Sequence, residues 1–110
     1  MNNFNFTKNK EIKIENFTKK IIFDRRGYFS KYYSSKHLSK KLDNIKQVNI
    51  SYNKKAGVIR GMHYQVGKFN ETKIISFIKG KIYDVIIDLR KNSKNYLKYF
   101  GITLSEKNRK

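Results

Sequence analysis

The β character of the chain is clearest in the stretch Lys73-Ile-Ile-Ser-Phe-Ile-Lys-Gly-Lys-Ile-Tyr-Asp-Val-Ile-Ile-Asp-Leu89. β-branched and aromatic residues fill both halves of this stretch, and Gly80 separates the halves. Such residues favour the pleated, half-buried surface of a strand, and a single glycine suits a tight turn between strands. The stretch therefore predicts two antiparallel strands, Lys73–Lys79 and Lys81–Leu89, joined at Gly80.

Further strand signals lie on both sides of this stretch. The strictest alternation runs over Gln47–Asn53, where Gln47, Asn49 and Ser51 would share one face of a strand and apolar residues the other. Shorter apolar or aromatic-rich runs occupy Glu11–Ile14, Lys20–Phe23, Tyr28–Tyr33 and Leu97–Leu104, with Gly27 at the turn between the second and third of them.

Helix signals are few. Ser34 and Ser35 are suitable N-caps for one short helix that would run through Asn44. The pattern as a whole predicts an all-β, mostly antiparallel fold of the sandwich or jelly-roll type. About seven strands are predicted, whereas a closed jelly roll needs about eight. We therefore expect a barrel that lacks its C-terminal part within these 110 residues.

Length and composition indicate one domain, covering residues 1–110. Of the residues, 38% are hydrophobic, and 16 are Phe or Tyr, which is enough for one modest core. The chain has no cysteine, so disulfides, thiolate nucleophiles and cysteine-bound zinc are excluded. No apolar run is long enough to span a bilayer, and the N-terminus lacks the apolar region of a signal peptide. The expected location is the cytoplasm, without a membrane partner.

The formal net charge of +18 invites a nucleic-acid interpretation. Two observations oppose it: lysines outnumber arginines 21 to 5, and the excess is divided almost evenly between the two halves of the chain. Nucleic-acid-binding proteins more often concentrate charge in a tail or stripe. We therefore expect a solvated lysine surface, no nucleic-acid partner, and attraction to a small acidic ligand such as a nucleotide diphosphate.

Candidate chemistry centres on Gly57-Val-Ile-Arg-Gly-Met-His-Tyr-Gln65, which contains one of only two histidines. A lone histidine among apolar residues is by default a packed core residue. Here Arg60 precedes His63 by three positions, and Lys73 opens the next predicted strand, which is more charge than packing requires. A metal site is not expected, because position 65 is Gln rather than a second histidine. His37, in the predicted helix, is expected to be a surface residue.

Five blocks of sequence occur in order: Phe23-Asp-Arg-Arg-Gly-Tyr-Phe29, Gln47-Val-Asn-Ile-Ser51, Gly57-Val-Ile-Arg-Gly-Met-His-Tyr-Gln65, Lys73, and Gly80-Lys-Ile-Tyr-Asp-Val-Ile-Ile-Asp-Leu-Arg90. Together they resemble the dTDP-4-dehydrorhamnose 3,5-epimerase family. The resemblance runs from about Phe23 to Asn108 and implies a cupin jelly roll, usually a homodimer. The family acts on a dTDP-linked 4-keto-6-deoxy sugar in rhamnose synthesis without metal or redox cofactor.

The resemblance also implies roles for individual residues. His63 matches the general base that removes the proton next to the ketone, and Lys73 matches the lysine that stabilises the enolate oxygen. The matches to positions that hold the sugar, the diphosphate or the nucleotide are Arg26, Gln47, Asn49 and Arg60. Asp84 matches a supporting carboxylate of the cavity wall, although a strand-end aspartate paired with a lysine would give the same pattern.

Three features depart from the expectations of the family or of an ideal strand. Arg60 and His63 would point to opposite faces of an ideal strand, so their joint use predicts a kink at Gly61. Lys31 stands where the family usually carries a glutamate that contacts the nucleotide. The family's second proton donor lies beyond position 110, so we expect no full epimerisation by residues 1–110 alone. A related 3- or 5-epimerase and a non-catalytic binding protein, for sugar nucleotide or nucleic acid, remain as alternatives.

Overall fold

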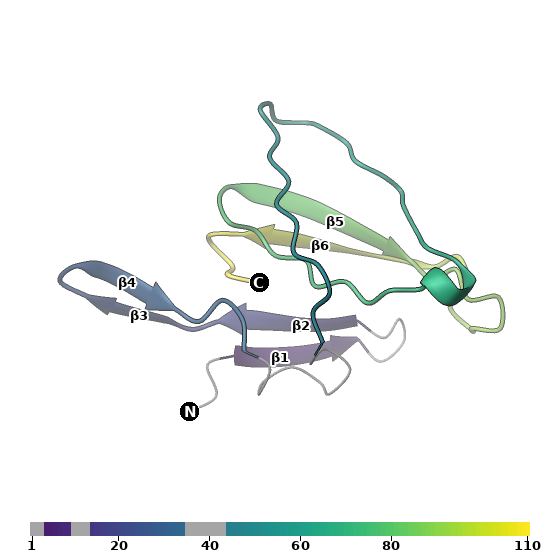
Figure 1. Cartoon of the computed structure of the whole chain (residues 1–110), viewed down its shortest axis with the longest axis horizontal. Coiled ribbons are helices and arrows are strands. Elements are labelled where there is room, and N and C mark those ends of the chain that lie inside the picture. Colours follow the sequence, from purple (N-terminus) through teal and green to yellow (C-terminus); the bar gives the residue numbers. More distant parts are fainter. Residues whose placement is uncertain (1–3, 10–13, 35–43) are drawn as a thin grey trace.

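The structure, a computed structural model, describes residues 4–9, 14–34 and 44–110. Within these ranges the regular secondary structure is nearly all β and forms three antiparallel two-stranded sheets, and the rest of the described chain is irregular (Figure 1). The one helical element among the described residues is a 3₁₀ turn, η3 (Gly67–Phe69). The strands are β1 (Phe4–Asn9), β2 (Ile14–Lys19), β3 (Ile21–Asp24), β4 (Gly27–Ser30), β5 (Lys81–Ile87) and β6 (Tyr99–Ser105).

The β3–β4 hairpin confirms the strand predicted at Lys20–Phe23, the turn after it and the first half of the strand predicted at Tyr28–Tyr33, since β4 ends at Ser30 and residues 31–33 form no strand. Ile21 pairs with Ser30 at the open end, and Asp24 pairs with Gly27 at the closed end. Gly27 has φ +138°, a conformation that side-chain-bearing residues rarely adopt. In Figure 1 this hairpin projects away from the β5–β6 hairpin.

The β5–β6 hairpin corrects the pairing predicted around Gly80. β5 and β6 confirm the strands predicted at Lys81–Leu89 and Leu97–Leu104, but β5 pairs with β6, from Lys81 with Ser105 to Ile87 with Tyr99. The predicted strand Lys73–Lys79 is wrong, because residues 70–77 are irregular and 78–80 form a bend. Gly80, with φ +88°, changes the chain direction into β5 without forming a hairpin. A strand exists only through its ladder of hydrogen bonds, and β6 takes the place beside β5 that the prediction gave to 73–79.

The predicted strand Gln47–Asn53 is also wrong. Residues 44–53 form no strand, and every residue of 44–60 is exposed. Alternation of polar and apolar residues produces a strand only where a neighbour pairs with the backbone and an apolar surface covers one face. Among the described residues neither is present beside this segment, so the apolar side chains Val48, Ile50 and Tyr52 stay exposed.

The N-terminal predictions have a different outcome. The predicted strand Glu11–Ile14 lies outside the described residues except for Ile14, the first residue of β2. The predicted helix from Ser34 or Ser35 to Asn44 falls almost entirely outside them, as does His37. β1 was not predicted, since Phe4 and Phe6 are its only apolar residues.

The loop between β5 and β6 is organised by one buried carboxylate. Asp88 is 4% exposed and accepts hydrogen bonds from the Arg90 guanidinium, with Nε 2.8 Å from Oδ1, and from Ser93 Oγ at 2.8 Å. Its backbone continues the ladder, because its N–H donates to Lys98 O at 3.0 Å and its carbonyl accepts from Leu97 N at 2.8 Å. Hydrogen bonding from Arg90 holds the pKa of the Asp88 carboxyl well below its usual range.

Apolar burial is small in the described part of the chain. Leu104 of β6, 5% exposed, is the one buried hydrophobic residue there, and Gly101 lies under the Tyr83 ring across the sheet. Large apolar side chains are exposed in many places, including Ile59 at 91%. Among the described residues no helix is both long and apolar enough to cross a membrane.

Candidate active site

Four of the seven candidate residues lie on one exposed segment, residues 44–66. Figure 1 shows this segment as a long loop that extends beyond the β5–β6 hairpin before it reaches η3. The four residues are Gln47, Asn49, Arg60 and His63. All four are exposed, which is what access to a ligand requires.

Gln47 and Asn49 form a polar pair. Gln47 Nε2 donates a hydrogen bond to Asn49 Oδ1 at 3.0 Å. The two side chains therefore lie together, as the alternation of Gln47–Asn53 predicts, although no strand forms. This bond does not use the Gln47 carbonyl oxygen or the Asn49 NH₂ group. The pair can therefore both accept a hydrogen bond from a sugar hydroxyl and donate one to it.

Arg60 is held against the end of the same polar run. Its Nε donates to Asn53 Oδ1 at 2.8 Å, and its Nη2 donates to Tyr52 O at 3.3 Å. A guanidinium has five N–H donors, so the Nη1 hydrogens are not used by these two bonds. Since neither partner is charged, the positive charge of Arg60 is directed by them without being neutralised. An oriented cation with spare donors can bind a phosphate oxygen.

His63 lies just beyond a distortion of the backbone at Gly61. Gly61 has φ +108°, so the backbone is not extended at this residue. Residues 58–66 form no strand, so a kink within a strand, as predicted here, is not tested. A Cβ at Gly61 would lie 3.3 Å from His63 Nδ1, tighter than nearly all such contacts, so the glycine leaves room for the imidazole. The ring is exposed, which does not fit a packed core histidine.

Lys73 carries a partner that the sequence analysis missed. Its Nζ lies 3.0 Å from Glu71 Oε1, and both side chains are about half exposed, at 50% and 47%. An exposed pair of this kind contributes little to stability, about 0–1 kcal/mol. The pair places a negative charge beside the Lys73 ammonium and partly neutralises it.

Arg26 is likewise paired, at the turn of the β3–β4 hairpin. Its Nη2 and Nε donate to Asp24 Oδ2 at 2.6 and 3.2 Å, and its backbone N–H donates to Oδ1 at 2.8 Å. The side-chain bond from Arg26 lowers the pKa of the Asp24 carboxyl. These bonds orient Arg26 on its own hairpin but do not join it to Arg60 or His63.

Asp84 lies in β5, half-buried and opposite Ile102 of β6. Within the described ranges no lysine or arginine forms an ion pair with it, so the structure does not support the strand-end ion pair considered for this residue. Asp88, on the same face by alternation, is committed to the Arg90 network described above.

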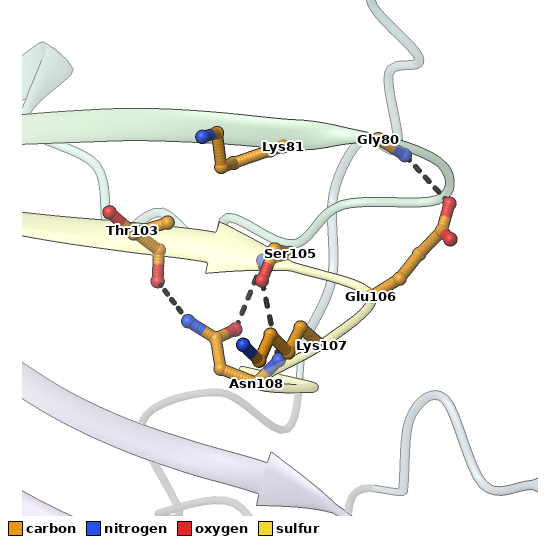
Figure 2. A pocket seen from close by; sticks show the side chains of 7 residues that line it. All are labelled: Gly80, Lys81, Thr103, Ser105, Glu106, Lys107 and Asn108. Atoms are coloured by element: carbon orange, nitrogen blue, oxygen red, sulfur yellow. Dashed lines mark hydrogen bonds between the residues drawn. The ribbon is translucent and has the colours of Figure 1, made fainter.

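A groove elsewhere in the molecule contains none of these candidates. Its volume is about 650 Å³, and Figure 2 shows it at the end of the β5–β6 hairpin, with Gly80, Lys81, Thr103, Ser105, Glu106, Lys107 and Asn108 around it. Glu106 Oε1 accepts from Gly80 N at 2.8 Å, and Asn108 Nδ2 donates to Thr103 O at 2.7 Å. These polar groups bind the chain just before β5 and just after β6, at the open end of the hairpin, so the candidate site is the 44–66 segment rather than this groove. Groups of three or more metal-ligating side chains are absent from the described part of the chain.

Comparison with known proteins gives one family. The family model described as dTDP-4-dehydrorhamnose 3,5-epimerase matches residues 11–110. A dTDP-4-dehydrorhamnose 3,5-epimerase of Shigella flexneri is 30% identical over 96 residues, which are 86% of this chain and 53% of that protein. One from Methanothermobacter thermautotrophicus is 34% identical over 91 residues, 82% of this chain and 49% of that protein. The chain thus spans about half the length of the curated relatives it matches.

Solved structures agree with this result. The crystal structure of dTDP-4-dehydrorhamnose 3,5-epimerase from Bacillus anthracis, with TDP and PPi bound, has a TM-score of 0.86 and 34% identity. That match covers 96% of this chain and 62% of the other. The enzyme from Elizabethkingia anophelis has a TM-score of 0.83 and 32% identity, over 97% of this chain and 60% of that chain. The five blocks of sequence, the all-β structure and a family match over residues 11–110 together show that the chain belongs to the dTDP-4-dehydrorhamnose 3,5-epimerase family.

Proposed function

We propose that the protein acts as a dTDP-4-dehydrorhamnose 3,5-epimerase, an isomerase that takes dTDP-4-dehydro-6-deoxyglucose toward dTDP-rhamnose. The observation that carries the proposal is the 44–66 segment, which carries an oriented, unneutralised arginine, an amide pair and an exposed histidine along one stretch of chain. Membership in the family supplies the reaction class. The relative from Bacillus anthracis has TDP and PPi bound, which supports a nucleotide diphosphate as the ligand class.

The proposed chemistry is proton transfer next to the 4-keto group. His63 accepts the proton, and the electrons of the broken C–H bond form the enolate, with its negative charge on the keto oxygen. Lys73 stabilises that oxygen as an ammonium. A proton delivered to the opposite face of the same carbon completes the inversion. The cofactor-free proposal follows from this balance, since no electrons leave or enter the substrate.

Binding of the substrate is assigned to four residues. We assign Arg60 to a charged oxygen of the diphosphate, because its spare donors suit phosphate, and Gln47 with Asn49 to sugar hydroxyls. Arg26 is assigned to the nucleotide end, and Asp84 to a supporting place in the cavity wall. Lys31, at the position where the family usually has a glutamate, is half-buried beyond β4 and would face the same end of the substrate.

We also propose that residues 1–110 form part of a single cupin-type jelly-roll domain and that the protein is a cytoplasmic homodimer. The all-β antiparallel pairs and the likeness to epimerase structures support the jelly roll. Support for the dimer comes from exposed aromatic residues of the projecting β3–β4 hairpin, Phe23 at 74%, Tyr28 at 69% and Phe29 at 64%. Light scattering at several protein concentrations measures the oligomeric state, and a monomer at all of them would contradict the dimer.

Ligand class is tested by calorimetry with dTDP, free rhamnose and a DNA duplex. The expected result is binding of dTDP in preference to the free sugar, with a shallow dependence on salt. A polyanion binder would instead lose affinity steeply, in proportion to the number of phosphates it contacts. Equal or absent affinity for dTDP and rhamnose would contradict the proposed pocket.

Replacing Arg60 by alanine is expected to weaken dTDP binding by ~1.5–3 kcal/mol, which is the cost of losing a charged hydrogen bond. Calorimetry on the unmodified and variant chains measures the difference. Arg109→Ala is the matched control, because it removes the same charge from the exposed C-terminal end. Unchanged affinity in Arg60→Ala would remove this residue from the site.

Replacing Glu71 by glutamine is expected to raise the rate of deuterium uptake next to the ketone of the dTDP-4-keto sugar about two- to five-fold at low salt, since it removes the negative charge beside Lys73, which is assigned to the enolate oxygen. The gain should shrink as salt rises, because exposed charges are screened. Glu106→Gln makes the same change of net charge, and its amide oxygen can still accept from Gly80 N. An equal gain in this control would show that net charge, not the Glu71–Lys73 pair, is responsible.

A further inference from the structure

Lys19, the last residue of β2, is a buried lysine that joins separate parts of the chain. It is 6% exposed, and its Nζ donates to Ser76 Oγ at 2.6 Å. The same Nζ lies 4.1 Å from the centroid of the Tyr32 ring and 4.8 Å from that of Phe77. Its backbone N–H donates to Arg109 O at 2.9 Å. Lys19 is therefore an exception to the solvated lysine surface expected from the sequence.

The surroundings of Lys19 suit a cation that has left water. Burying an ammonium is costly unless the charge finds partners, and here two ring faces and one hydroxyl oxygen provide them. A further bond closes the group, since Tyr32 OH donates to Phe77 O at 3.2 Å. Burial lowers the pKa of the Lys19 ammonium. We call Lys19, Tyr32, Ser76 and Phe77 the Lys19 cluster.

The cluster fixes a segment that has no strand ladder of its own. Residues 70–77 are irregular, so sheet hydrogen bonds do not fix their place. Ser76 and Phe77 bind this segment to β2 and to the chain just after β4. Ser76 follows Lys73 by three positions, which is about 10 Å of extended chain. Fixing Ser76 and Phe77 therefore limits where the Lys73 ammonium can lie.

We propose that Lys19 is a positioning residue, which holds the segment 73–78 through Ser76 and Phe77 and thereby places Lys73 for its role beside the enolate oxygen. This inference rests on the proposed function of Lys73. Lys19 itself touches no substrate in this scheme. Because Arg60, Gln47 and Asn49 lie on the 44–66 segment, loss of Lys19 should affect the proton-transfer step more than the binding of dTDP.

The functional test compares Lys19→Met, Lys19→Arg and the matched control Lys79→Met, which removes a lysine from the exposed end of the same segment. Deuterium uptake next to the ketone of the dTDP-4-keto sugar reports proton transfer, and calorimetry with dTDP reports binding. Lys19→Met should lower the exchange rate about ten-fold or more while dTDP affinity changes less than two-fold. Lys19→Arg, which keeps a cation between the rings, should restore most of the rate, and Lys79→Met should behave as the unmodified chain.

A second, ligand-free measurement separates this inference from the proposed function. ¹⁵N relaxation of residues 73–78 should show a rigid segment in the unmodified chain and in Lys79→Met. It should show nanosecond mobility in Lys19→Met and in the milder variant Ser76→Ala, which keeps Lys19 and both rings. If the chain bound no dTDP, the proposed function would be contradicted, but the relaxation measurement on residues 73–78 would still test the positioning by Lys19. A segment equally rigid in Lys19→Met and Ser76→Ala, or an exchange rate unchanged by both, would overturn the inference.

Discussion

Replacing His63 by alanine is expected to reduce deuterium uptake next to the ketone of the dTDP-4-keto sugar by about 100-fold or more. A positioned general base contributes about 10²–10⁴-fold to such a step, and the 44–66 segment contains no other histidine and no carboxylate. Proton exchange is the suitable readout, because it needs a base on one face of the sugar only. NMR of the sugar in heavy water measures the uptake directly.

His37→Ala is the control for this experiment, since it removes the other histidine of the chain. It should leave exchange unchanged. Affinity for dTDP should be nearly unchanged in His63→Ala, because the imidazole is assigned to the reacting carbon and not to the diphosphate. If deuterium uptake were retained in His63→Ala, His63 would not be the general base. Loss of both exchange and dTDP binding would point instead to a structural role in the loop.

Replacing Asp88 by asparagine is expected to lower the Tm by about 10 °C, a large effect for one atom of difference. The Asp88 side chain is 1% exposed and accepts from both Arg90 and Ser93. Asparagine presents an NH₂ group where one of those donors points, so a buried donor faces another donor and the Arg90 charge loses its partner. Circular dichroism during heating measures the change.

The chain contains its own control for this prediction. Asp24 and Arg26 repeat the aspartate–x–arginine arrangement with equivalent hydrogen bonds, but the Asp24 side chain is 48% exposed. Water can replace the lost bonds there, so Asp24→Asn should shift the Tm by about 2 °C or less. Equal effects at the two sites would show that burial of the carboxylate is not what makes Asp88 important.

The Asp88 carboxylate should also make the stability of the chain depend on pH in acid. The folded pKa of Asp88 is depressed, so its contribution to stability is complete above its ordinary pKa of about 3.9 and is lost as pH falls toward the folded value. Urea unfolding of the unmodified chain should therefore show stability falling below about pH 4. The fall should be shallower in Asp88→Asn, which has no carboxylate to protonate at this position.

Local sequence determined those parts of the fold that need only neighbouring residues. β3, β4 and the turn at Gly27 follow from two apolar runs separated by a residue that accepts positive φ. Gly61 also has a positive φ, but residues 58–66 form no strand, so the kink that would bring Arg60 and His63 to one face stays a prediction. Family membership was also readable, since five blocks in order are specific even when no single block is. The roles of His63, Lys73 and the binding residues stay predictions.

The tertiary structure decided what depends on partners distant in sequence. Alternation in Gln47–Asn53 and the β-branched and aromatic residues of Lys73–Lys79 indicated strands, but a strand needs a hydrogen-bonded neighbour, and the neighbour of β5 is β6. Lys19 was one of 21 lysines in the sequence, and its burial became visible only when Ser76, 57 positions away, lay beside it. Hydropathy patterns record which side chains can be buried, whereas pairing and burial depend on which segments meet in space.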